Sequence, residues 1–179
     1  MSVCEGYAEA MNSLLISAGI KSYIIDGYGD GGLHEWNLVN IHGSLYHLDA
    51  TFDDPISAKG NVITHNYFNV NDEQISKNHT WDKANYPSTN AVEANYFVVN
   101  KLIVNDGSMY YQVVKNAIIK KISVFNIRTK SYDTKTYNPN VIAKVLKEIT
   151  IKNNVSKSLS YSFNYDLNTC VIEILLNYK

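Results

Sequence analysis

Two strand-like segments on either side of the dipeptide His42-Gly43 constrain the fold more than any other feature of the sequence. Residues 33–41 and 44–51 are predicted to form two strands. A His-Gly dipeptide between two such segments predicts a tight two-residue loop. In the resulting hairpin Ile41 lies opposite Ser44, and the rest of the register follows from that pair.

This register predicts that His34 and Asp49 lie on the same face of the sheet. His34 lies opposite Thr51, two residues beyond Asp49, which makes His34 and Asp49 diagonal neighbours. Diagonal neighbours have Cα atoms about 7–8 Å apart, which lets a carboxylate reach an imidazole nitrogen. Each residue also has a simpler interpretation, since a strand histidine is often structural and an aspartate at a strand end often caps a turn.

Residues 2–18 predict an amphipathic helix that ends at Gly19. Ser2 and Glu5 have the spacing of a capping box, which places Cys4 in the first turn. Unpaired backbone N–H groups and the helix dipole favour a thiolate there, and the same groups can bind an oxyanion. The alternative is that Cys4 belongs to the core. The predicted apolar face consists of Cys4, Tyr7, Ala8, Met11, Leu14, Leu15 and Ala18.

The remainder of the chain predicts a second α+β region, with a domain boundary near residue 90. Residues 52–90 are rich in turns. The elements expected in the first 90 residues, besides those above, are a strand at 21–28, a glycine-rich bend at 29–32, a short strand near 67–70 and a helical turn after Asn71. Those expected in 91–179 are a strand at 96–104, a turn at Asp106-Gly107, helices at 109–121 and 140–149, a strand at 123–128, and a hairpin of 158–166 with 170–178.

Composition and charge give no sign of a nucleic-acid-binding or membrane-spanning protein, and no cofactor and no metal are expected. A net charge of −1 gives no reason to expect nucleic acid as a partner, and no apolar run approaches the roughly 20 residues that cross a bilayer. The two cysteines have neither a disulfide-framework nor a zinc spacing, and Cys170 is expected to be buried in an apolar run. The remaining histidines are expected to be structural or on the surface: His42, His47, His65 and His79.

Three sequence blocks resemble the catalytic core of the bacterial transglutaminase-like superfamily. They are VCEGYA from residue 3, HEWNLV from His34, and YHLDATFDDP from Tyr46, and residues 67–82 are similar to the segment that follows the core in bacterial relatives. The resemblance covers residues 1–82. It implies a papain-like α+β fold, in which a helix carrying the cysteine packs on an antiparallel sheet carrying the histidine and the aspartate. Cys4, His34 and Asp49 would be its catalytic triad.

The chain departs from this resemblance at its start. Ser2 stands where relatives usually have glycine, and relatives carry helices before the cysteine, whereas this chain starts three residues before Cys4. We therefore expect residues 1–90 to be an N-terminally truncated catalytic core with an exposed apolar face. A homo-oligomer is one way to cover such a face. Residues 91–179 have no predicted role.

The resemblance implies a cysteine acyl-transfer enzyme that acts on peptide or glutamine amides. Hydrolysis by a protease or amidase is the plainer expectation, and cross-linking to an amine stays open. Trp36 would pack beside the His34–Asp49 pair and shield it from water, or simply fill the core. The alternatives are a non-catalytic scaffold and a peptide-binding module of a bacterial surface or secreted protein. A protein or peptide partner and a location outside the cytoplasm are expected, although there is no signal-peptide pattern.

Overall fold

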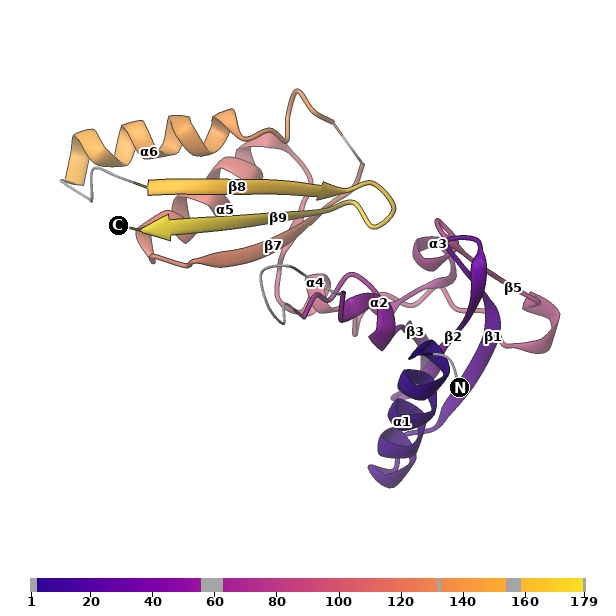
Figure 1. The fold of residues 1–179 in the computed structure, drawn as a ribbon. Helices are drawn as coiled ribbons and strands as arrows, with labels where there is room; N and C mark the ends of the chain where they lie inside the picture. Colours follow the sequence, from indigo (N-terminus) through magenta and orange to yellow (C-terminus); the bar gives the residue numbers. More distant parts are fainter. Residues whose placement is uncertain (1–2, 56–62, 132, 154–158, 179) are drawn as a thin grey trace. The chain divides into compact units, whose positions relative to one another are not determined.

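The chain forms two compact units, Met1–Asn100 and Lys101–Lys179 (Figure 1). The computed structural model describes residues 3–55, 63–131, 133–153 and 159–178. Each unit combines helices with a mainly antiparallel sheet, which confirms the α+β class. The boundary follows Asn100 rather than residue 90, because the Asn95 side chain donates to the backbone oxygens of Phe68 (3.0 Å) and Asn69 (3.3 Å) and so ties its segment to the first sheet.

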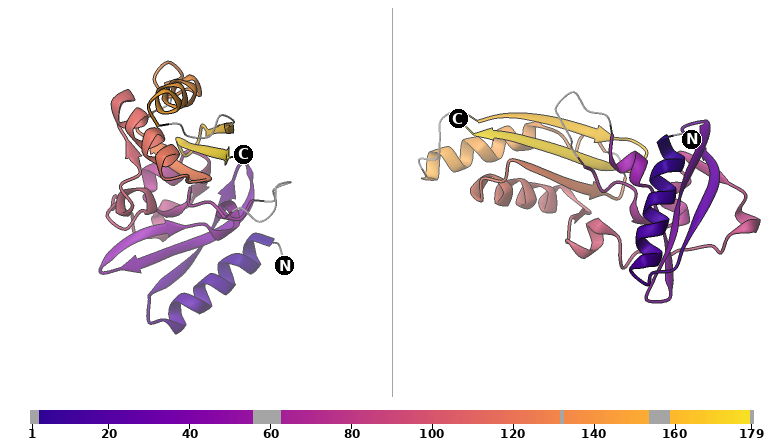
Figure 2. Two further views of the ribbon diagram at one scale, coloured as in Figure 1. Left: turned by 90° about the vertical axis from the view of Figure 1, so that its left-hand side faces the viewer. Right: turned by 60° about the horizontal axis from the view of Figure 1, so that its bottom comes forward.

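The first unit is built on a five-stranded antiparallel sheet with the order β4-β3-β2-β1-β5. Helix α1 packs against β1 and β2 and lies alongside them in the right-hand view of Figure 2. The elements are α1 (Val3–Ser17), β1 (Ser22–Gly29), β2 (Gly32–Ile41), β3 (Ser44–Leu48), α2 (Ala50–Asp53), β4 (Phe68–Val70), α3 (Asp72–Ile75), β5 (His79–Trp81), the 3₁₀ turn η1 (Lys83–Asn85) and α4 (Tyr96–Val99).

The hairpin of β2 and β3 has the predicted register. Ile41 pairs with Ser44, and the ladder runs on to Asn37 and Leu48. Both loop residues have positive φ, +52° at His42 and +90° at Gly43, as a loop that matches the twist of the strands requires. The prediction that the second strand reaches residue 51 is wrong, because residues 50–53 wind into α2. The expected strand pairing of His34 with Thr51 therefore does not form.

Helix α1 buries a narrower face than its sequence predicts. Ala8 is buried, and Met11 and Leu15 pack against a cluster of Val39, Tyr46 and Leu48 on the sheet. Tyr7 and Leu14, which were expected on the same face, are 37% and 67% exposed. The sheet covers only the side of the helix that faces it, so the neighbouring apolar row is left uncovered. The predicted cap at Ser2 lies outside the described residues.

The opposite face of the first sheet carries the main apolar cluster of this unit. Its buried members are Ile25, Trp36, Leu38, Tyr67, Val70 and Ile75. Successive side chains of β2 point to opposite faces of the sheet. Leu38 therefore enters this cluster, whereas Val39 faces α1. The short strand and helical turn predicted near residues 67–75 are confirmed as β4 and α3.

The second unit has a four-stranded sheet with the order β6-β7-β9-β8, in which only β6 and β7 are parallel. Helices α5 and α6 pack on one face of it around Ile127, Ile172 and Ile174. Its elements are β6 (Ile103–Val104), α5 (Gly107–Ile119), β7 (Val124–Thr129), α6 (Asn140–Asn153), β8 (Leu159–Asp166) and β9 (Val171–Tyr178).

Two predictions for the later part of the chain are wrong. Residues 96–104 do not form one strand, because Asn95 caps a helical turn by accepting from the Phe97 N–H (3.1 Å), and only Ile103–Val104 are extended. Cys170 is half-buried rather than part of the core, because it lies in the β8–β9 turn with φ +54°. None of the helices within the described residues has the length and apolar character needed to cross a membrane.

Candidate active site

Asp49 directly follows β3, and its two carboxylate oxygens have different partners. Its Oδ1 accepts from the Phe52 backbone N–H (3.0 Å) and caps α2, and its Oδ2 lies 2.6 Å from His34 Nε2. The side chain is fully buried. Asp49 therefore caps a turn with one oxygen and contacts His34 with the other, so the capping role and the pairing with His34 both apply.

The His34 ring is enclosed by close packing. The Phe52 ring lies 4.6 Å away between centroids, and the Trp36 ring stacks at 5.9 Å. On another side the ring rests on Gly29, where an added Cβ would lie 2.9 Å from His34 Cδ2. Burial acts to lower the pKa of His34, but the hydrogen bonds and charges of Asp49 and Cys4 raise it above its ordinary value. Asp49 and Cys4 therefore stabilise the protonated ring that forms when His34 takes up a proton.

Cys4 lies half-buried in the first turn of α1 and makes a side-chain hydrogen bond with His34. Because Nε2 of His34 faces Asp49, Nδ1 is the ring nitrogen left for the thiol. The Tyr7 hydroxyl donates to Asp54 Oδ2, which ties α1 to the end of α2. The three predicted residues are thus brought together, with His34 in the middle.

Two opposing effects act on the ionisation of Asp49. Burial raises the pKa of its carboxyl, whereas hydrogen bonds from His34, His79 and the Phe52 N–H lower it. The net effect is a pKa below the ordinary value, because three donors to one buried carboxylate outweigh its desolvation. Asp49 is accordingly an anion that accepts hydrogen bonds from its neighbours.

Trp36 fits both of its predicted descriptions. It is a fully buried member of the apolar cluster, and it stacks on the His34 ring. Its indole Nε1–H donates to His47 Nδ1 (2.9 Å), so the hydrogen on the His47 ring sits on Nε2 and points to Asp72 Oδ1 (2.8 Å). Burial lowers the pKa of His47. His47 is a neutral structural histidine, as the sequence suggested.

His79 is the site residue that sequence reasoning missed. Its Nε2 lies 2.9 Å from Asp49 Oδ2, the same oxygen that contacts His34. Strand β5 carries it into the site by pairing with β1, where Gly29 lies opposite His79. That pairing joins residues about 50 apart in sequence, so the residues next to His79 do not predict that β5 pairs with β1. The other two histidines are an exposed loop residue, His42, and one stacked on Tyr96, His65.

His34, Asp49 and His79 offer three ligand atoms within 4.8 Å of one another, which invites comparison with a metal site. Ligands about 2.0–2.1 Å from a tetrahedral zinc ion stand roughly 3.3 Å apart. The nitrogen-to-oxygen distances here are 2.6 Å and 2.9 Å, which are hydrogen-bond lengths. In this arrangement both histidines are hydrogen-bonded to Asp49.

Asp53 is a second buried carboxyl next to this site. Its Oδ1 accepts from the Tyr67 N–H (2.9 Å) and the Thr64 hydroxyl (3.0 Å), while its buried Oδ2 has no hydrogen-bond partner. Burial, with the charge of Asp49 as a smaller cause, raises the pKa of Asp53 to about 7. Asp53 therefore holds residues 64–67 against the end of α2, and its carboxyl keeps its proton to a much higher pH than an exposed aspartate does.

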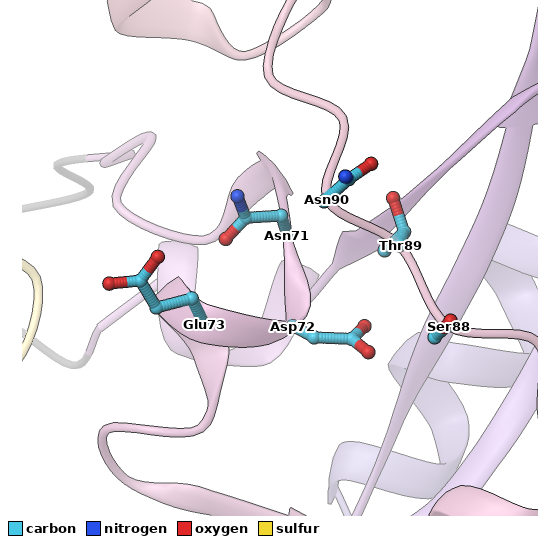
Figure 3. Close-up of a pocket in the computed structure, with 6 residues that line it drawn as sticks. All are labelled: Asn71, Asp72, Glu73, Ser88, Thr89 and Asn90. Carbon is cyan, nitrogen blue, oxygen red and sulfur yellow. The ribbon is translucent and has the colours of Figure 1, made fainter.

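A polar pocket of about 410 Å³ lies elsewhere in the first unit (Figure 3). Its lining residues are Asn71, Asp72, Glu73, Ser88, Thr89 and Asn90. Two of these side chains stabilise the local structure: Asn71 forms a capping box with Gln74, and Asp72 accepts a hydrogen bond from His47. None of the triad residues lines it.

No protein-family model and no curated protein matches this sequence. The support for a function therefore comes from the three sequence blocks and from the geometry around His34.

Proposed function

We propose that the first unit is a cysteine acyl-transfer enzyme of the transglutaminase-like kind, built on a papain-like core. Cys4 is its nucleophile, His34 its general base and acid, and Asp49 the residue that orients His34. One observation carries the proposal: His34 lies between a buried, ionised carboxylate at 2.6 Å and the cysteine thiol. This is the nucleophile, base and orienting acid that thiol acyl transfer requires.

The reaction begins with transfer of the Cys4 thiol proton to His34. The thiolate sulfur attacks the carbonyl carbon of an amide, and the carbonyl oxygen becomes an oxyanion that backbone N–H groups at the start of α1 can bind. The imidazolium of His34 then protonates the leaving nitrogen, the C–N bond breaks, and a thioester on Cys4 remains. Asp49 keeps the Nε2 proton of His34 in place, so Nδ1 handles the proton that moves.

The second half of the reaction depends on which nucleophile takes the acyl group. Water, deprotonated by His34, gives a carboxylic acid and the free thiol, which is the reaction of a protease or amidase. An amine in place of water gives a new amide and hence a cross-link. Hydrolysis needs no second binding site, so we propose it as the main reaction, on a peptide or a glutamine side chain of a protein substrate. The reaction uses no cofactor.

The test combines substitution and thiol chemistry. Cys4→Ala should abolish hydrolysis of a protein substrate and incorporation of a primary amine, whereas Cys170→Ala should retain both. Iodoacetamide at pH 6 should modify Cys4 faster than a model thiol, because His34 stabilises the thiolate. Equal rates, or an activity that survives Cys4→Ala, would rule out this site.

A different function is favoured by the apolar row that α1 leaves uncovered. Val3, Tyr7 and Leu14 lie on this row and are 72%, 37% and 67% exposed. As a second candidate, this face binds a protein partner, with a second copy of the chain as the simplest one, and the domain serves as a scaffold or peptide-binding module. Sedimentation should then detect a dimer that Leu14→Lys dissociates, while Cys4 would react like an ordinary thiol.

A further inference from the structure

His79 is buried, with 1% of its surface exposed, and both of its ring nitrogens have polar partners. Nε2 lies 2.9 Å from Asp49 Oδ2, and Nδ1 lies 2.8 Å from Asn78 Oδ1. The ring also contacts its neighbours closely, with centroid distances of 5.0 Å to Trp36 and 4.8 Å to Phe52. The orientation of the imidazole is therefore determined by both hydrogen bonding and packing.

The hydrogen-bond pattern assigns the protons on His79. The Asn78 Nδ2 amide lies 2.9 Å from both Asp30 Oδ1 and the Tyr67 hydroxyl, so the amide nitrogen points to those oxygens and the amide oxygen points to His79. Nδ1 of His79 must then donate to Asn78. Asp49 is ionised and can only accept, so Nε2 must donate as well. A histidine that donates from both nitrogens is an imidazolium.

We propose that His79 is a positioning residue of the active site: its imidazolium donates the second hydrogen bond to Asp49 Oδ2, holds this carboxylate against His34, and offsets part of its negative charge. This inference rests on the proposed function of Cys4 and His34, which it deepens. His79 does not touch the substrate or the thiol. It acts through Asp49, in the way that second residues orient a catalytic histidine–carboxylate pair.

The charge on His79 has a consequence that simple packing would not have. A buried cation disfavours protonation of the groups around it and favours the thiolate. Removing that charge should raise the pKa of His34 and move the onset of Cys4 reactivity to higher pH. The titratable and charged groups around the His79–Asp49 pair are Cys4, Asp30, His34, His47, Asp53 and Tyr67.

Two substitutions separate the charge from the hydrogen bond. His79→Gln removes the charge and keeps an N–H donor, whereas His79→Phe removes both. His47→Gln is the matched control, because His47 is equally buried and also bonded to an aspartate, but to Asp72 instead of Asp49. Each variant is measured in the full chain. The readouts are the pH profile of iodoacetamide modification on the Cys4 peptide, with kcat and KM for hydrolysis.

We expect His79→Gln to move the midpoint of Cys4 modification upward by about one pH unit, the size typical of losing one nearby charge. His79→Phe should shift it similarly and also lower kcat by about tenfold or more, with KM nearly constant, since only the reacting geometry is affected. His47→Gln should leave the midpoint where it is in the wild type. Midpoints that agree in wild type and both His79 variants would overturn the proposal.

The ¹⁵N chemical shifts of the His79 ring give a readout that does not depend on activity. Two protonated ring nitrogens are expected because both have acceptors, Asn78 Oδ1 and Asp49 Oδ2, and a ring with one unprotonated nitrogen would contradict the inference even if His79→Phe fails to fold. If wild-type Cys4 reacts like a model thiol while His79 is doubly protonated, the enzyme proposal fails but the assignment of His79 to Asp49 stands. If Cys4 is activated and His79 is neutral, only the inference about His79 fails.

Discussion

The two units of this chain use their interiors differently. The second unit has one continuous apolar core, which joins α5, α6, β7 and β9 around residues such as Ile127 and Ile174. The first unit divides its apolar residues between two smaller clusters. Among the described residues it also holds ten of the twelve buried polar or charged side chains, His34, Asp49 and His79 among them.

The interior of the second unit is mainly apolar packing, whereas the interior of the first unit also holds hydrogen-bonded polar side chains in fixed positions. Burying a polar group costs free energy unless it is hydrogen-bonded, so a cluster of buried histidines and aspartates persists only where each has its partners. The first unit meets that condition at Asp49, which has three donors. In the described part of the second unit, the buried polar or charged side chains are Arg128 and Thr129. Three substitutions, in order of expected effect, test the comparison.

The largest effect should come from Asp49→Asn. The asparagine keeps an oxygen for the Phe52 N–H but cannot accept from His34 as an anion, so the ring loses its orientation. By analogy with other triads we expect kcat/KM to fall by about 10³–10⁴-fold. Hydrolysis assays on wild type and variant, with circular dichroism to verify folding, measure this. A loss below tenfold would mean that the polar cluster serves stability alone.

Next in size is a cavity in the apolar core of the second unit. Ile174→Ala should lower the free energy of unfolding of that unit by about 2–5 kcal/mol, because Ile174 is fully buried. Trp36 and Trp81 are the only tryptophans and both lie in the first unit, so tryptophan fluorescence reports on that unit alone.

In urea, far-UV circular dichroism of Ile174→Ala should therefore show an earlier transition that tryptophan fluorescence lacks. The modification rate of Cys4 should stay at the wild-type value. An equal shift in the circular dichroism and fluorescence transitions would mean that the two units unfold together. Their interiors could then not be treated as independent.

The smallest effect concerns pH. The pKa of Asp53 is raised from 3.8 to about 7 by burial, so the folded state holds a proton that the unfolded state releases. The stability that goes with this proton is fully present below about pH 4 and is lost as the pH rises towards 7. Asp53→Asn cannot ionise. It should flatten the pH dependence of unfolding, by an amount on the order of 2 kcal/mol between pH 4.5 and 7.5.

Tryptophan fluorescence in urea at several pH values measures this in the first unit. Asp49, whose pKa is lowered, contributes in the opposite sense, because its stabilisation is present above its unfolded pKa and lost as the pH falls. Asp133, an exposed aspartate of the second unit, is the control, and Asp133→Asn should leave the profile of the first unit unchanged. A wild-type profile identical to that of Asp53→Asn would contradict the buried proton.

The parts of the site that depend on neighbouring residues could be predicted from the sequence alone. His42-Gly43 set the hairpin register, because few residue pairs adopt two successive positive φ angles, and that register carried His34 close to Asp49. The first turn of α1 and the mainly antiparallel α+β class also followed from local patterns. Each of these rests on hydrogen bonds and side-chain alternation within about 20 residues.

Other features could not be predicted from local sequence: β3 ends at Leu48, Asp49 uses one oxygen as a helix cap, and His79 shares the other. The helical turn at residues 96–99 and the position of Cys170 in a turn belong to the same group. The physical reason is the same throughout. The β1–β5 pairing and the enclosure of a buried carboxylate arise from many weak contacts between distant segments, and no local pattern records their sum.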